Sequence, residues 1–243
     1  IIKNGEMMTK CIAVVSGKGG VGKSMSTINI GHALTSLGKK VVLVDANLVT
    51  PNVALQLGFM NPKGTLNKFL RREQDLHEIT YLHESGLSVI PSSPSYEEFQ
   101  KTNTQQLAEV FEHLDNTAQF VLIDAPSGLG YDVDQVLKNS DEVIVVVTPT
   151  IPSVMDALKT MQAAKAQDNT IAGILVNMSN KGKHELQISE IEQILGQHII
   201  GNVPHNKKVR KALHQGMPVH HLFPRSKVAK EFRQVAQHLS HFH

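Results

Sequence analysis

The feature that most constrains this chain is a glycine-rich stretch, Gly17–Ser24, which reads G-K-G-G-V-G-K-S. It follows a short apolar run rich in β-branched residues and precedes a segment whose apolar residues have helical spacing. Glycines let the backbone curl so that successive N–H groups point inward and form an anion-binding nest. The helix start adds unpaired N–H donors and partial positive charge. In this strand–loop–helix context, the pattern G-x-x-x-x-G-K-[ST] predicts a phosphate-binding loop.

The two polar side chains that end the motif have distinct predicted roles. The Lys23 ammonium is expected to reach the β- and γ-phosphates of ATP, and the Ser24 hydroxyl is expected to ligate Mg²⁺. The alternative is a glycine-rich turn that matches the pattern by coincidence. The residues expected to contact the nucleotide here are Gly17, Lys18, Gly19, Gly20, Val21, Gly22, Lys23, Ser24 and Met25.

Short β-branched runs alternate with helical patterns along the chain. The predicted strands are Cys11–Ser16, Lys40–Asp45, Leu87–Ile90, Phe120–Asp124, Glu142–Val147, Ile171–Asn177 and Ile199–Asn202. The predicted helices are Ser26–Leu37, Gln105–Leu114, Asp132–Leu137, Ser153–Ala166, Leu186–Leu195 and Ser226–Leu239. Several strands are apolar almost throughout, which is typical of parallel strands covered on both faces. The alternation predicts an α/β fold of three layers, with a doubly wound, mostly parallel sheet and right-handed crossovers.

One domain is predicted from residue 10 to residue 243. Residues 46–84 carry several Pro and Gly residues and are expected to form loops and short helices. Residues 1–9 are expected to lie outside the fold, as an N-terminal arm or as residues added to the natural chain. No repeat, low-complexity block or Pro/Gly/Ser-rich linker divides the rest.

Composition excludes several classes of protein. The only cysteine is Cys11, so the chain has neither a disulfide framework nor a CxxC pair for zinc or an iron–sulfur cluster. This favours a cytoplasmic setting. A net charge of +2 does not by itself indicate nucleic acid or membrane binding. No apolar run approaches the roughly 20 residues of a membrane span.

With Lys18 the loop reads K-G-G-V-G-K-S and resembles the deviant Walker A motif of the MinD/ParA ATPases. The resemblance extends from about Lys10 to Leu239. Further segments resemble other motifs of the family. Its switch I is matched by Val42–Asp45 with Asn52, and its Walker B with switch II by Phe120–Gly128. Its base-contacting strand end is matched by Val176–Asn177, its later base-proximal loop by Gly201–Pro204, and the C-terminal pattern of the MinD branch by Gly216–Val219 with Pro224 and Ser226.

The resemblance implies a homodimer that closes face to face over two ATP molecules. Lys18 would then reach the partner's nucleotide, and Asp156 would hold Lys18 when the partner is absent. Asp124 is expected to hold Mg²⁺ through its water shell, and Asp45 is expected to act similarly. The open alternatives are a surface lysine for Lys18, a helix-start residue for Asp156 and strand-capping residues for the other two.

Two further nucleotide contacts and two departures come from the same comparison. Asn177 is expected to contact adenine, and Pro204 to lie beside the base. Many relatives read Asp-x-Asp at switch I, where this chain has Asn47, which can bind a water but cannot accept its proton. Strand alternation would point Asn47 the same way as Asp45, toward the γ-phosphate; alternatively, Asn47 caps the next segment. Thr150 stands where some relatives have an acidic residue.

The C-terminal region carries signals with several interpretations. Val228, Phe232, Val235, Ala236 and Leu239 form one stripe, which favours a core-facing helix over a membrane anchor. A metal site at the histidine pairs His220–His221 and His238/His241 is not favoured. The same holds for DNA binding at the basic runs, where a solvated helix face is expected. These runs are Lys207, Lys208, Arg210 and Lys211, then Arg225, Lys227, Lys230 and Arg233.

Three functional hypotheses remain from the sequence. The first is an ATP-driven positional switch of the MinD type, with slow hydrolysis, an unidentified protein partner and membrane contact only through that partner. The second is a nucleotide-gated scaffold that hydrolyses ATP poorly, which Asn47 motivates. The third is a DNA-associated partition ATPase of the ParA type, which the basic runs motivate.

Overall fold

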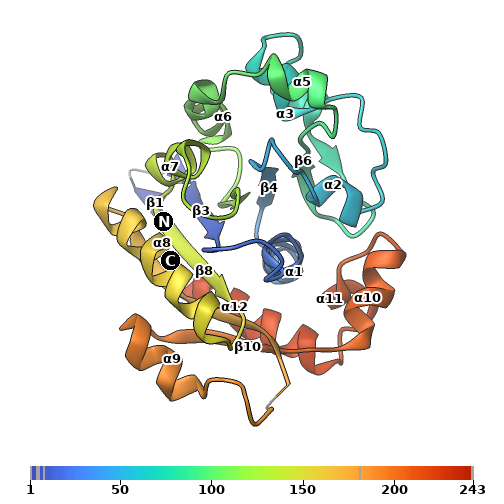
Figure 1. Cartoon of the computed structure of the whole chain (residues 1–243). Helices are drawn as coiled ribbons and strands as arrows, with labels where there is room; N and C mark the ends of the chain where they lie inside the picture. The colour runs from blue at the N-terminus through green and yellow to red at the C-terminus, as the bar shows by residue number, and fades with distance from the viewer. Residues whose placement is uncertain (1, 4–5, 8, 181, 242–243) are drawn as a thin grey trace.

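The computed structural model describes residues 2–3, 6–7, 9–180 and 182–241, and an eight-stranded sheet lies at its centre (Figure 1). The strand order is β10-β9-β8-β3-β7-β4-β6-β5. Neighbouring strands pair in parallel, except that β5 is antiparallel to β6. The bounds are β3 Lys10–Val15, β4 Val41–Asp45, β5 Tyr81–Leu82, β6 Ser88–Ile90, β7 Phe120–Asp124, β8 Glu142–Val147, β9 Thr170–Ser179 and β10 Ile199–Pro204.

Helices cover both faces of this sheet. Along β3, Ile12 and Val14 face one apolar layer while Ala13 and Val15 face the other, so the strand is apolar throughout because both faces are buried. The first layer contains side chains of α1 Lys23–Ser36, α2 Val53–Gln56, α10 Lys207–His214, α11 Val219–Leu222 and α12 Lys227–His241. The second contains side chains of α3 Leu66–Leu70, α4 Leu76–Ile79, α6 Leu107–Leu114, α7 Tyr131–Lys138, α8 Ile151–Ala166 and α9 Ile188–Leu195.

Topology brings three chain segments to one edge of the sheet. Strand β3 lies next to β7, and β7 lies next to β4. Because the three strands are parallel, the segments that follow them emerge at the same carboxyl edge, where doubly wound sheets bind ligands. In the β4–β7 register Asp45 pairs with Asp124, so both carboxylates end their strands side by side.

The structure confirms the predicted fold class and, with shifts of a few residues at their ends, all seven predicted strands. The predicted helix at 105–114 is divided into η1 Thr104–Gln106 and α6. Residues 46–84 hold three short helices and the edge strand β5, while α5 Tyr96–Gln100, α10 and α11 are helices outside the predicted set. The stripe of α12 is buried, as expected for a core-facing helix.

Part of the predicted N-terminal arm is described. β1 Ile2–Lys3 and β2 Glu6–Met7 pair antiparallel as a separate two-stranded sheet. Thr9 already contacts the domain, since its Oγ1 donates to Ala118 O at 2.7 Å and accepts from Asn116 N. The boundary at residue 10 stays a prediction. Across the described residues, no helix is long and apolar enough to cross a bilayer.

Candidate phosphate-binding site

The loop between β3 and α1 has a conformation that requires glycine. Gly20 and Gly22 have φ angles of 81° and 86°, in the left-handed region that side chains avoid. A Cβ atom on Gly22 would lie 2.2 Å from Asn177 Nδ2, and one on Gly17 would lie 2.3 Å from the backbone carbon of Asp156. Strand β9 and helix α8 therefore press directly on the loop and fix its path.

Hydrogen bonds hold the loop from the strands around it. Asn177 Nδ2 donates to Val21 O at 2.8 Å, and Ser16 Oγ donates to Lys18 O at 3.0 Å. On the β7 side, Gly128 N donates to Ser16 O at 2.9 Å. The loop is therefore a preorganised part of the fold, with its N–H groups at the start of a fourteen-residue helix.

Three side chains of α1 converge on one carboxylate. Lys23 Nζ lies 2.7 Å from Asp124 Oδ1, and Ser24 Oγ donates to Asp124 Oδ2 at 2.5 Å. Thr27 Oγ1 lies 3.2 Å from Asp124 Oδ1. Asp124 is fully buried and Lys23 nearly so, which means that removing one partner would leave a buried charge uncompensated.

The second carboxylate, Asp45, is bound by backbone groups. Its Oδ1 accepts from Asn47 N at 3.2 Å, and its Oδ2 accepts from Asn52 N at 3.1 Å and Val53 N at 3.0 Å. Burial, and then the neighbouring charge of Asp124, raise the pKa of Asp45, although the Val53 N–H, Lys23 and the Asn47 N–H oppose the rise. Asp45 therefore holds the backbone of the segment that follows β4 in place beside Asp124.

The donor set fits a hard divalent cation. Asp45 and Asp124 are both fully buried, and the one ammonium that bonds either carboxylate is that of Lys23, within the described residues. A hydroxyl and carboxylates are the oxygen ligands that Mg²⁺ accepts, and it keeps several waters and phosphate oxygens. Ser24 would hold the ion directly, and Asp124 and Asp45 through water. Over the part of the chain that the structure describes, no cluster of three or more His, Cys, Asp or Glu forms a site held by protein alone.

The expected direction of Asn47 is wrong for this structure. β4 ends at Asp45, so strand alternation no longer governs the residue two positions later. The Asn47 amide instead donates from Nδ2 to Thr50 O at 2.8 Å, and its Oδ1 accepts from Thr50 N at 3.1 Å. This is the turn-capping alternative, in which a short amide satisfies the nearby backbone.

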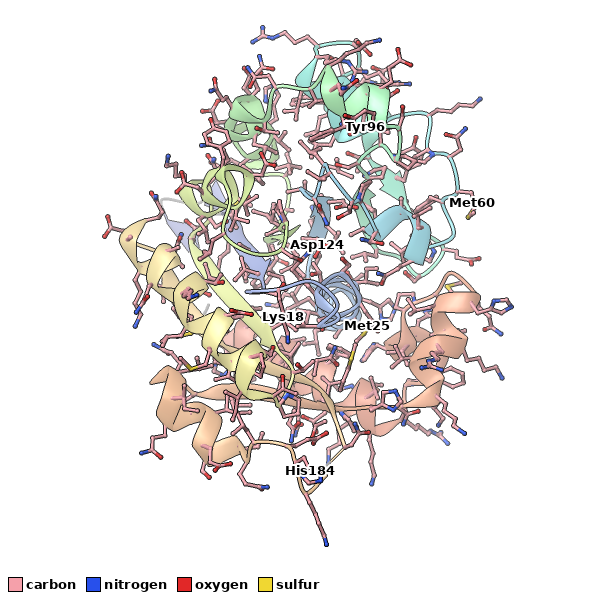
Figure 2. The ribbon with its side chains drawn as sticks, viewed as in Figure 1. Lys18, Met25, Met60, Tyr96, Asp124 and His184 are labelled. Carbon is pink, nitrogen blue, oxygen red and sulfur yellow. The ribbon has the colours of Figure 1, made fainter. Side chains whose placement is uncertain are left out.

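Lys18 is half-buried and lies with Asp124 near the middle of the view in Figure 2, while the exposed Met60 and Tyr96 lie toward its margin. The expected contact between Lys18 and Asp156 is absent, since the two form no ion pair among the described residues. The Asp156 backbone meets the loop instead, at Gly17. Thr150 is the N-cap residue of α8.

Three of the expected nucleotide contacts, Asn177, Met25 and Pro204, lie close to the loop or at a strand end. Asn177 is buried and bound to Val21, so the structure gives it a role in holding the loop. Met25 is buried on the first turn of α1, and Pro204 ends β10. The contact of Asn177 with adenine, the place of Pro204 beside the base and the contact of Met25 with the nucleotide stay predictions.

Two hydrogen bonds at the carboxylates of the site were not predicted from the sequence. Thr27 follows Lys23 by four residues, a helical spacing that places both side chains on one face and was available as a signal. Ser92 is fully buried, and its Oγ donates to Asp45 O at 2.6 Å across forty-seven residues of chain. No local sequence pattern predicts the contact between Ser92 and Asp45.

Comparisons with known proteins agree with this geometry. A ParA family model, described as NUBPL iron-transfer P-loop NTPase, matches residues 7–240. An ATP-binding protein of Methanocaldococcus jannaschii is 35% identical, over 96% of this chain and 88% of its own length.

Two solved structures are also similar. The cell division ATPase MinD of Pyrococcus furiosus has a TM-score of 0.92 at 28% identity, covering 96% of this chain and 99% of that one. MinD of Pyrococcus horikoshii, solved with Mg-ADP, has a TM-score of 0.92 at 28% identity, covering 97% of each chain. The chain belongs to the ParA family of P-loop NTPases, with MinD proteins among its homologues.

Proposed function

We propose that this protein is an ATP-dependent switch of the MinD type, whose two subunits close face to face when both hold ATP and magnesium. ATP binding closes the dimer, the dimer presents a surface to a protein partner, and hydrolysis reopens it. The observation that carries this proposal is an apolar rim around the phosphate-binding loop, which consists of Leu129, Met155 and Met178.

Each member of this apolar rim is exposed and adjoins a residue that meets the loop. Leu129 follows Gly128, which donates its N–H to Ser16 O. Met155 precedes Asp156, whose backbone abuts Gly17. Met178 is 36% exposed, and its Cε would be 3.3 Å from a Cβ on Gly22. Apolar side chains gathered around a charged loop fit a surface that a partner covers.

In this proposal the two lysines divide the phosphate charge. Lys23, nearly buried, neutralises the β- and γ-phosphates of its own subunit. Lys18, which is half-buried, serves the nucleotide of the other subunit. Magnesium, when bound, offsets the negative charge that develops on the phosphates during transfer. Asp124 and Asp45 orient its water shell, and Ser24 binds it.

Turnover is slow in this account. The Asn47 side chain is bound to Thr50, so in this account the segment after β4 supplies neither a proton acceptor nor a hydrogen-bond partner to the attacking water. Phosphoryl transfer depends mainly on positioning and electrostatics, which the rest of the site retains. A nucleotide-gated scaffold that barely hydrolyses ATP is the limiting case of the same account.

The relatives support a role in spatial positioning, such as division-site placement. Proteins similar to this chain include septum site-determining MinD of Bacillus subtilis, at 27% identity, and a chain of a MinC:MinD complex from Aquifex aeolicus, at 26% identity. We propose that the protein is cytoplasmic and reaches a membrane only through an unidentified protein partner. The iron transfer named in the family description has no counterpart here, because Cys11 is the only cysteine and its burial raises the pKa of its thiol to about 12.

Light scattering of the purified protein with Mg-ATP and with Mg-ADP tests the proposal. The expected result is a dimer with ATP and a monomer with ADP. A matched pair of variants separates the interface from general surface effects: Met155→Asp changes the apolar rim, and Met60→Asp changes an exposed methionine outside it. Only Met155→Asp should prevent the ATP-dependent dimer. A dimer that forms equally with both nucleotides would contradict the switch.

A further inference from the structure

Thr27 lies one helical turn after Lys23 on α1 and is fully buried. Its hydroxyl has two neighbours that accept hydrogen bonds: Lys23 O at 3.0 Å and Asp124 Oδ1 at 3.2 Å. The hydroxyl has a single proton to share between them. Thr35, farther along the same helix, makes the ordinary version of this contact, with Gly31 O at 3.0 Å and no carboxylate.

The three side-chain donors to Asp124 differ in what nucleotide would do to them. Lys23 and Ser24 occupy Asp124 in this structure at 2.7 and 2.5 Å. In the proposed function both are needed elsewhere, at the phosphates and at magnesium. Loading the site would therefore remove two charge-assisted or short hydrogen bonds from one buried carboxylate at the same moment.

We infer that Thr27 is a positioning residue that keeps Asp124 oriented when Lys23 and Ser24 turn to the nucleotide. This inference rests on the proposed nucleotide site. When the ammonium leaves Oδ1, the Thr27 hydroxyl donates its hydrogen bond to Asp124 Oδ1 in place of Lys23 O, which needs only a rotation of the O–H bond. The Lys23 carbonyl loses little, since it sits inside the helix and can accept from the backbone.

The physical need for such a donor comes from burial. With no accessible surface in this structure, Asp124 has no bulk water to replace a lost donor, so without Thr27 its carboxylate would be free to rotate. Rotation would misplace the group that is to orient the water shell of magnesium. The effect of Thr27 should therefore be seen in the magnesium dependence of nucleotide binding, rather than in nucleotide binding itself.

The test compares Thr27→Val with the wild type by calorimetry of ADP binding, in Mg²⁺ and in EDTA. Valine has the same shape and lacks the hydroxyl. In EDTA the two proteins should bind ADP equally well. In Mg²⁺ the gain in affinity should be about two- to tenfold smaller for Thr27→Val, the range that one hydrogen bond supplies.

Two further variants sharpen the comparison. Thr27→Ser restores the hydroxyl and should restore the magnesium-dependent gain. Thr35→Val removes the same back-bond from the same helix and should leave that gain unchanged. If Thr27→Val does not fold, Thr27→Ala, which places no methyl group in the position of the hydroxyl, gives the same comparison.

Three outcomes would overturn the inference. A full magnesium-dependent gain in Thr27→Val would mean that Asp124 is held without this hydroxyl. An equal loss with and without Mg²⁺ would mean that Thr27 supports the loop and not the carboxylate. A wild-type protein that binds no ADP under either condition would refute the proposed site itself, and the inference with it.

Discussion

A buried histidine cluster predicts a sharp loss of stability in mild acid. His32 on α1 contacts two histidines of α11: its Nδ1 lies 2.9 Å from His220 Nδ1, and its Nε2 lies 3.3 Å from His221 Nδ1. Burial, and then the charge of neighbouring histidines, lower the pKa of His32 to about 4. Burial, and then Arg233 on α12, lower the pKa of His220 to about 4.

The sign and size follow from proton linkage. Both histidines have an ordinary pKa of 6.5, so the unfolded chain takes up protons first as the pH falls. Stability is fully present above pH 6.5 and is lost as the pH falls from there toward 4. At pH 5 each group costs about 2 kcal/mol relative to pH 8. The two groups together cost about 4 kcal/mol, against a typical stability of roughly 5–15 kcal/mol.

Urea unfolding at pH 7.5 and pH 5.0 measures this loss. His220→Gln should lose about half as much stability between the two values as the wild type, whereas His184→Gln, in an exposed loop, should behave as the wild type. The other groups facing the cluster, His83 with Glu84 beside it, remain in every variant. The same is true of the site carboxylates, so the difference isolates His220. Equal acid losses in wild type and His220→Gln would refute the reasoning.

Three further predictions concern the site and the last helix. Lys23→Ala should weaken ATP binding by on the order of 100-fold or more, because the phosphate charge loses its buried counterion; calorimetry checks this. Asn47→Asp should cost about 1 kcal/mol of stability by removing the donor to Thr50 O, and single-turnover phosphate release should stay within about twofold of wild type. The purified protein should not sediment with anionic liposomes, since Phe232 and Leu239 are buried in the core; strong ATP-dependent sedimentation would contradict their burial.

The sequence predicted the sheet well because its strands are buried on both faces. Runs such as Phe120–Asp124 and Glu142–Val147 are apolar almost throughout and end where polar residues begin, and the structure reproduces both sets of bounds. The two-residue edge strand β5 escaped prediction, since a strand that short has no periodicity. The irregular region 46–84 was expected from its Pro and Gly residues, but not the arrangement of its pieces.

The site was predicted where one local motif defines it. The motif Gly17–Ser24 predicted a loop between a strand and a helix, which the structure places between β3 and α1. The hydrogen bonds of Lys23 and Ser24 to Asp124 were not predicted, and their contacts with phosphate and magnesium stay predictions. Long-range contacts such as that from Ser92 to Asp45 depend on how distant segments pack, which no local pattern records. The direction of Asn47 was predicted by extending strand alternation past Asp45, where β4 ends, and its amide instead binds Thr50.

The most direct test of the account is the oligomeric state of Lys18→Ala with nucleotide. The wild type should scatter as a dimer of the 26.7 kDa chain in Mg-ATP and as a monomer in Mg-ADP. Lys18→Ala should bind ATP with near wild-type affinity and remain a monomer. Lys40→Ala, an exposed lysine just before β4 at the opposite edge of the sheet, should dimerise normally. An ATP-dependent dimer of unchanged strength in Lys18→Ala would contradict the account and make Lys18 an ordinary surface lysine.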